Sequence, residues 1–161
     1  MTFSPDEIAT AYHEAGHAVM ALVLGRPVQR VSIEPNHLRL GHCAIKKGTF
    51  RPSGDPLETE ILFMLGGPAA EARHVGEYSW DAAAQDLRGV RALTTQRTAG
   101  ERQAERLEQR LLAKTEHILN RPGVWTAVER IVEELLRCTT ISGRAARHLF
   151  EHATAEAAGN Q

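Results

Sequence analysis

The chain has 161 residues and a formal net charge of −1 at neutral pH. This length suits a core-forming unit, so residues 1–161 are expected to form a single domain. The balanced charge argues against a nucleic-acid partner, and we expect neither a membrane span nor a signal peptide. Two cysteines are too few for a disulfide scaffold, which favours a reducing, cytoplasmic setting.

The first predicted helix begins after Ser4-Pro5-Asp6-Glu7, a capping box with proline at the first helical position, and ends before Gly25. Within it, residues 13–17 read His-Glu-Ala-Gly-His. This spacing puts His13 and His17 on one face, with Glu14 able to reach a metal-bound water, as in zinc peptidases. The alternative is two unrelated histidines, but burying them in so apolar a helix would be costly without a partner.

A small sheet of two or three strands is predicted next. Alternation from residue 28 to 34 puts Val31 and Ile33 on one face, and a second strand follows over residues 38–46. Cys43 has no second cysteine nearby, so we interpret it as a half-buried strand thiol rather than a metal ligand.

The remainder is predicted to be helical. After a loop over residues 47–54, a helix starts at Asp55-Pro56 and is interrupted at Gly66-Gly67-Pro68, where the glycine pair allows close approach of another helix. Four more helices are expected: one from about Asp81, which caps it, one over 101–119, one over 124–137 and a short one after Ser142. The tail from about residue 154 is expected to fray. The fold class is therefore mainly α with a small β-sheet (α+β).

A catalytic zinc needs three protein ligands and one open position, and the pentapeptide supplies two of them. Residues 18–30 contain no His, Asp or Glu, which excludes the short-spaced third ligands of some zinc peptidases. The remaining candidates lie on or near the second and third predicted helices: Glu71, His74, Glu77, Asp81 and Asp86. The residues alone leave this choice open.

Several segments, taken in order, resemble the protease domain of the FtsH family, the membrane-anchored AAA+ zinc proteases. They are residues 12–19, 28–35, 65–71, 83–87 and 135–143, so the resemblance covers nearly the whole chain. It implies an FtsH-type domain in which the metal-binding helix is followed by a β-hairpin and a helical bundle. The chain departs from the family pattern at Pro68, where the family has arginine, at Ala72, where it has glutamate, and at Asp81 or Ala82, where it has glycine.

The resemblance implies that Asp86 is the third zinc ligand, placed about two turns into its helix, beside His13 and His17. It also implies that Glu71 hydrogen-bonds a ligand histidine. The simpler alternatives are a solvent-facing Asp86 and a surface salt bridge for Glu71, and His74 is expected on the surface.

Together these expectations describe a zinc metallopeptidase that cuts unfolded or extended polypeptide, with Glu14 as general base. The strand edge at Leu40, Gly41 and His42 is predicted to bind substrate by strand addition. No P-loop pattern is present, so the chain would act without ATP, and a separate ATPase and self-association are partners that the resemblance suggests. Two alternatives stay open: a non-catalytic binding domain that keeps the fold, and a metal-dependent hydrolase of a non-peptide amide.

Overall fold

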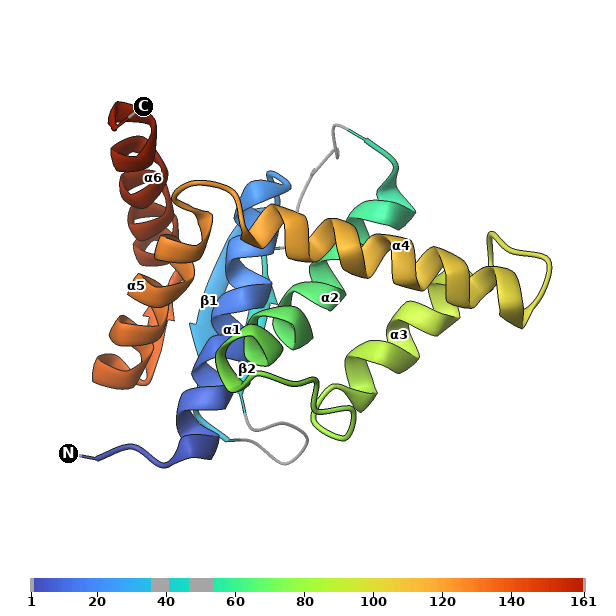
Figure 1. Cartoon of the computed structure of the whole chain (residues 1–161). Coiled ribbons are helices and arrows are strands. Elements are labelled where there is room, and N and C mark those ends of the chain that lie inside the picture. Colours follow the sequence, from blue (N-terminus) through green and yellow to red (C-terminus); the bar gives the residue numbers. More distant parts are fainter. Residues whose placement is uncertain (1, 36–40, 47–53, 161) are drawn as a thin grey trace.

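The computed structural model describes residues 2–35, 41–46 and 54–160. These residues form a mainly helical fold with a three-stranded antiparallel sheet, which confirms the predicted fold class (Figure 1). In chain order the elements are α1 (Pro5–Val23), β1 (Val28–Ser32), β2 (His42–Ile45), α2 (Pro56–Val75), α3 (Ala84–Thr94), α4 (Glu101–Leu119), α5 (Val124–Cys138), β3 (Thr140–Ser142) and α6 (Gly143–Gly159).

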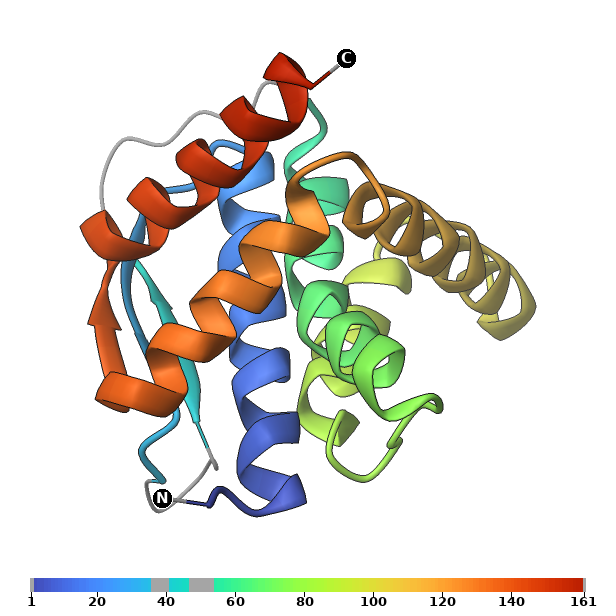
Figure 2. The ribbon, with the colours of Figure 1, turned by 60° about the vertical axis from the view of Figure 1, so that its left-hand side comes forward.

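Helix α1 lies at the centre of the molecule, between the sheet and α2 (Figure 2). It starts as predicted, because the Ser4 hydroxyl accepts from the Glu7 N–H and the Glu7 carboxylate accepts from the Ser4 N–H. Its middle is fully buried in the hydrophobic core, which also contains Ile61, Leu62 and Leu65 of α2. The histidine motif therefore sits on a helix that the core holds on several sides.

The two central helices touch through their backbones, as the glycine pair predicted. A Cβ on Gly66 would lie 2.8 Å from the carbonyl oxygen of Gly16, and a Cβ on Gly16 would lie 2.5 Å from the Ala70 Cβ. Only glycine on both helices permits such an approach.

Helix α2 runs without a break through Gly66, Gly67 and Pro68, so the predicted interruption is wrong. All three residues are buried against the neighbouring elements. Tertiary packing thus outweighs the intrinsic cost of glycine, about 1 kcal/mol per residue, and of an internal proline. The start at Asp55 follows the prediction, because the Asp55 carboxylate accepts from the Leu57 N–H at 3.0 Å.

The sheet has the strand order β2-β1-β3, with both pairs antiparallel. β2 is the predicted partner of β1, and the described part of it begins at His42; residues 38–40 of the predicted strand lie outside the described residues. A bulge between Val28 and Arg30 shifts the register, so that Val28 and Val31 are both buried. β3 was not predicted, because three residues are too short to show a pattern of alternation.

The C-terminal helix α6 is longer than predicted. It continues to Gly159, whereas a short helix and a frayed tail from about residue 154 were expected. Ala153 is buried, and the turn at Gly123 lies so close that a Cβ there would be 2.7 Å from the Ala153 carbonyl. Packing against the α4–α5 turn therefore orders the end of α6. Across the described ranges, no helix is both long and apolar enough to cross a bilayer.

Candidate metal centre

Two histidines of α1 and one aspartate of α3 bring their ligand atoms together. The His13 Nε2 atom lies 2.9 Å from Asp86 Oδ2, the His17 Nε2 atom lies 3.4 Å from the same oxygen, and the two Nε2 atoms are 3.2 Å apart. Ligands bonded to a tetrahedral zinc ion at about 2.0 Å are separated by about 3.3 Å. The three atoms therefore have the spacing that a zinc ion requires.

Hydrogen bonds on the far side of each imidazole fix its orientation. His13 Nδ1 donates to Glu71 Oε2 at 2.7 Å, and His17 Nδ1 donates to the carbonyl oxygen of Phe63 at 2.9 Å. A proton on Nδ1 leaves the Nε2 lone pair free for a metal. Glu71 is buried and lies on α2, so it connects the metal helix to its neighbour. The Phe63 contact was missed because a backbone acceptor has no signature in the sequence.

Gly67 leaves the space that the two imidazoles occupy. A Cβ at this position would lie 2.6 Å from the His17 Cδ2 atom and 2.8 Å from the His13 Cδ2 atom. The glycine pair therefore serves two purposes, because Gly66 faces the backbone of α1 and Gly67 faces the histidine rings. The sequence predicted the close approach of a second helix but not the contact with the histidine rings.

The electrostatics of the site couple His13 to its acidic neighbours. Burial lowers the pKa of His13, but its hydrogen bonds with Asp86 and Glu71 outweigh burial and raise the pKa to about 10. Burial would raise the pKa of Asp86, whereas its hydrogen bonds with His13 and His17 hold that pKa well below the usual range. The raised pKa would keep His13 protonated at neutral pH in the absence of a metal ion, and a metal ion would displace this proton.

Asp86 lies in the first turn of α3, not two turns into a helix as predicted. Its carboxylate is therefore close to the positive end of the helix dipole. The predicted cap at Asp81 is also wrong: the helix begins at Ala84, with Ala83 at the N-cap position and no side-chain cap. Ser79 accepts from the N–H groups of Ala82 and Ala83 in the turn that precedes the helix. Residues 81–83, which were predicted to begin the helix, belong instead to the turn between α2 and α3.

The candidate ligands open onto a cleft of about 520 Å³. One wall is a stripe of α1 that runs from Asp6 through Thr10 and His13 to His17. The other walls come from Gly41 and Cys43, from Phe63 and Glu71, and from the segment between residues 79 and 88.

Glu14 lies on the floor of this cleft, with 7% of its surface exposed. A Cβ on Gly41 would lie 2.9 Å from the Glu14 Cγ atom, so Gly41 leaves room for the glutamate side chain. Glu14 therefore lies between the histidines of its own helix and the edge strand β2.

Of the three residues predicted to bind substrate, one lies in the lining of the cleft. Gly41 lines the cleft, His42 lies in β2 but not among the lining residues, and Leu40 lies outside the described residues. Cys43 is a half-buried free thiol, as predicted, whose pKa is raised by burial.

Of the five candidates for a third ligand, Asp86 is the one that joins the histidine Nε2 atoms. His74 is exposed and stacks on Tyr12, with ring centroids 3.9 Å apart.

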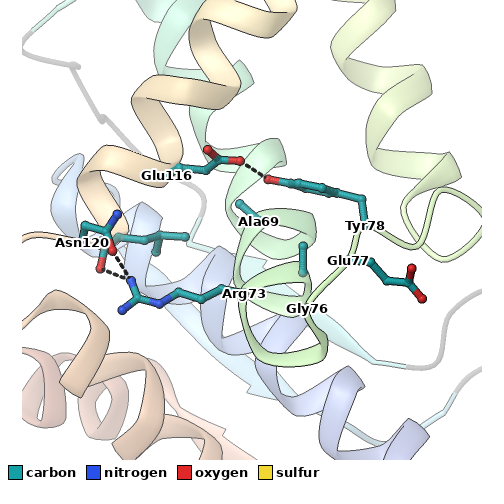
Figure 3. A pocket seen from close by; sticks show the side chains of 9 residues that line it. Ala69, Arg73, Gly76, Glu77, Tyr78, Glu116 and Asn120 are labelled. Atoms are coloured by element: carbon teal, nitrogen blue, oxygen red, sulfur yellow. Dashed lines mark hydrogen bonds between the residues drawn. The ribbon is translucent and has the colours of Figure 1, made fainter.

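A second pocket, of about 400 Å³, lies where the end of α2 meets α4 (Figure 3). Its polar groups bind one another: the Tyr78 hydroxyl donates to Glu116 at 2.5 Å, and Arg73 donates to Asn120 at 2.6 Å. The Tyr78 bond anchors the segment between α2 and α3 to α4, and Asp86 follows directly after this segment. Glu77 lines this pocket rather than the metal cleft.

Residues 3–100 match the model of peptidase family M41, a span that includes α1, α2, α3 and every candidate ligand. The chain belongs to peptidase family M41. The match places the histidine motif of this M41 domain in a family that uses zinc, in agreement with the spacing of the three ligand atoms.

Similar proteins include ATP-dependent zinc metalloproteases called FtsH. The protein from Protochlamydia amoebophila is 37% identical over 82 residues, covering 48% of this chain and 9% of that protein. FtsH of Rubrobacter xylanophilus is 41% identical over 66 residues, 38% of this chain and 10% of that protein. FtsH 1 of Sorangium cellulosum is 35% identical over 112 residues, 65% of this chain and 18% of that protein. The M41 domain thus spans only a small part of the length of these relatives.

Proposed function

We propose that this M41 domain is a zinc metallopeptidase that hydrolyses peptide bonds in unfolded or extended polypeptide. His13, His17 and Asp86 would hold the zinc ion, and Glu14 would act as general base. The observation that carries this proposal is the convergence of three ligand atoms within 3.4 Å of one another, beside a buried glutamate in the same cleft. Membership of a zinc-using peptidase family supports it independently.

Zinc held at this site would polarise the scissile carbonyl and lower the pKa of a water molecule. The protein side chains supply the remaining parts. Glu14 takes a proton from the attacking water and returns it to the leaving amine. Glu71 and the Phe63 carbonyl keep both imidazoles oriented, so the ligand atoms need little rearrangement to bind the ion.

The position of β2 favours an extended substrate. β2 is an edge strand, because it pairs with β1 alone in the described sheet, and its neighbour Gly41 lines the cleft beside Glu14. A peptide added along this edge would gain backbone hydrogen bonds and pass over the metal centre. A substrate must lie extended along this edge, so a folded protein would first have to be unfolded by a separate ATPase. Substrates of the domain alone would be unfolded segments or short peptides.

The test compares the parent chain with Glu14→Gln. We expect about one zinc ion per chain in both proteins, measured by metal analysis, and cleavage of casein only by the parent. Glu105→Gln, on the exposed surface of α4, is the matched control and should cleave like the parent. Casein cleavage by Glu14→Gln would contradict the mechanism. Bound zinc without cleavage by any of the proteins would favour a binding domain or a hydrolase of another amide.

A further inference from the structure

The two ends of the metal cleft differ in chemistry. Asp6 lines it in the first turn of α1, and Phe63 lines it beside His17. Asp81 lines it from the turn before α3, which lies towards the start of α1 in both views (Figures 1 and 2). A substrate lying along the cleft would therefore meet different side chains on the two sides of its scissile bond.

The acidic end carries two exposed carboxylates, of which Asp6 also lies near the positive end of the α1 dipole. Asp6 lies in the first turn of α1 and Asp81 in the turn before α3, and both residues are exposed. Among the described residues, no side-chain hydrogen bond or ion pair engages either carboxylate. This distinguishes them from Glu71 and Asp86, which bind His13. Asp6 and Asp81 are therefore available to a ligand.

The lining formed by the described residues has an excess of negative charge. It includes one arginine, Arg88, and five acidic residues, so a divalent metal ion would leave the balance negative. The acids are Asp6, Glu14, Glu71, Asp81 and Asp86. Such a field attracts basic side chains and disfavours acidic ones.

The distance from Asp6 to the metal centre defines where the charge would act. Asp6 precedes His13 by seven residues on α1, which corresponds to about 10 Å along a helix. An extended chain advances about 3.3 Å per residue. The acidic end therefore lies about three residues from the bond that would be cut.

The opposite end has a different surface. The Phe63 ring lies against His17, with centroids 5.2 Å apart, and Arg26 covers the ring at 4.9 Å from its centroid. Arg26 occupies one face of the ring and is ion-paired with Glu60, so within the described part of the chain this end lacks the unpaired carboxylates of the other end. Any preference for positive charge should thus be limited to one side of the scissile bond.

We infer that the cleft selects extended peptides that carry lysine or arginine about three residues from the scissile bond, on one side only, and that Asp6 and Asp81 determine this choice. The inference rests on the proposed peptidase function and adds its substrate class.

The experiment uses the zinc-loaded chain and starts by mapping its cleavage sites in casein by mass spectrometry. Peptides built around one mapped site then carry Arg, Gln or Glu at the third residue on either side. We expect kcat/KM to be about tenfold higher for Arg than for Glu on one side, because solvent-exposed charges contribute modestly, and equal on the other. Salt at about 0.5 M should reduce the preference, since it screens exposed charges.

The double variant Asp6→Asn/Asp81→Asn should bring the kcat/KM values of the Arg and Glu peptides within about twofold of each other, because the Arg peptide loses the attraction and the Glu peptide loses the repulsion. Glu101→Gln, an exposed acid at the start of α4, should keep the preference. The single variant Asp81→Asn lies in a turn, so it should reduce the preference for Arg over Glu without disturbing the first turn of α1.

Equal rates for Arg and Glu on both sides, or a preference that survives the double variant, would overturn the inference and leave the peptidase function intact. If the parent chain cleaved neither casein nor any peptide, the proposed function itself would fail.

Discussion

At the scale of single residues, Gly67 matters because its missing side chain leaves room for the His13 and His17 imidazoles. The rings lie with their Nε2 atoms 3.2 Å apart, and Glu71 and the Phe63 carbonyl hold their far sides. A ring that must move to avoid a methyl group would also lose its orienting hydrogen bond. The candidate metal site therefore depends on a residue that is not itself a candidate ligand.

We expect Gly67→Ala to weaken zinc binding by tenfold or more while the domain stays folded. Overpacking of this kind costs about 1–3 kcal/mol, and about 1.4 kcal/mol corresponds to tenfold in affinity. Competition with a chromophoric chelator measures the change. Gly54→Ala is the control, since a Cβ at that position meets nothing within 4 Å. Unchanged zinc affinity in Gly67→Ala would show that the rings have more freedom than their contacts indicate.

A second prediction at this scale concerns pH. His13 has a pKa of about 10 in the metal-free protein and carries a proton at neutral pH, whereas the lowered pKa of Asp86 keeps that carboxylate charged. Zinc must displace the His13 proton, so apparent affinity should rise about tenfold per pH unit between pH 6 and 8. Chelator competition across this range tests the slope. A flat profile would mean that His13 is already neutral before zinc binds.

At the scale of elements, the contact between α1 and α2 sets the metal centre in place. α1 carries the histidines, α2 supplies Glu71, Phe63 and Gly67, and the two helices meet where Gly16 faces Gly66. Separation of the helices by the width of a methyl group would move the histidines away from Glu71. Helix packing and metal geometry are thus coupled.

Gly16→Ala should lower the free energy of unfolding, because its Cβ would lie 2.5 Å from the Ala70 Cβ and 3.0 Å from the Gly66 carbonyl carbon. We expect a loss of about 1–3 kcal/mol, the usual cost of overpacking, even though alanine is the better helix former by about 1 kcal/mol. Urea unfolding followed by circular dichroism measures it. Gly159→Ala, whose Cβ would meet nothing within 4 Å, is the control. Stabilisation by Gly16→Ala would contradict the close approach.

At the scale of the whole molecule, the candidate metal centre lies between two parts of the fold. α1 belongs to the central core, while α3 and the start of α4 project from it (Figure 1). α3 buries few residues and is held to α4 through Arg91, Thr94 and Glu108. Asp86 already bonds His13 of α1, and a metal held by Asp86 and the two histidines would strengthen this link between α3 and α1.

Removing zinc should therefore lower the melting temperature and loosen residues 76–95 more than α5 and α6. A ligand present at about 100 times its Kd stabilises by about 2.7 kcal/mol, which corresponds to roughly 5–10 °C for a domain of this size. Calorimetry with and without chelator, and hydrogen exchange by segment, measure both effects. His17→Ala should show no zinc-dependent shift. Uniform exchange changes along the whole chain would contradict a local link.

Much of this domain follows from local sequence patterns. The capping box at Ser4 and the cap at Asp55 predict where two helices begin, because capping depends on residues close in the chain. The spacing of His13 and His17 likewise depends on one helix alone. These features were predictable because short-range geometry decides them.

Tertiary structure decided the rest. The residues alone left five candidates for the third ligand, and the fold brings Asp86 to the histidines because α3 turns back towards α1 after an irregular segment. The room that Gly67 leaves for the histidine rings is apparent only when α1 lies against α2. Helix α2 stays continuous through Pro68 because burial of this segment outweighs the low helix propensity of glycine and proline. A helix carries its own periodicity in its sequence, but the approach of distant segments depends on packing across the whole molecule.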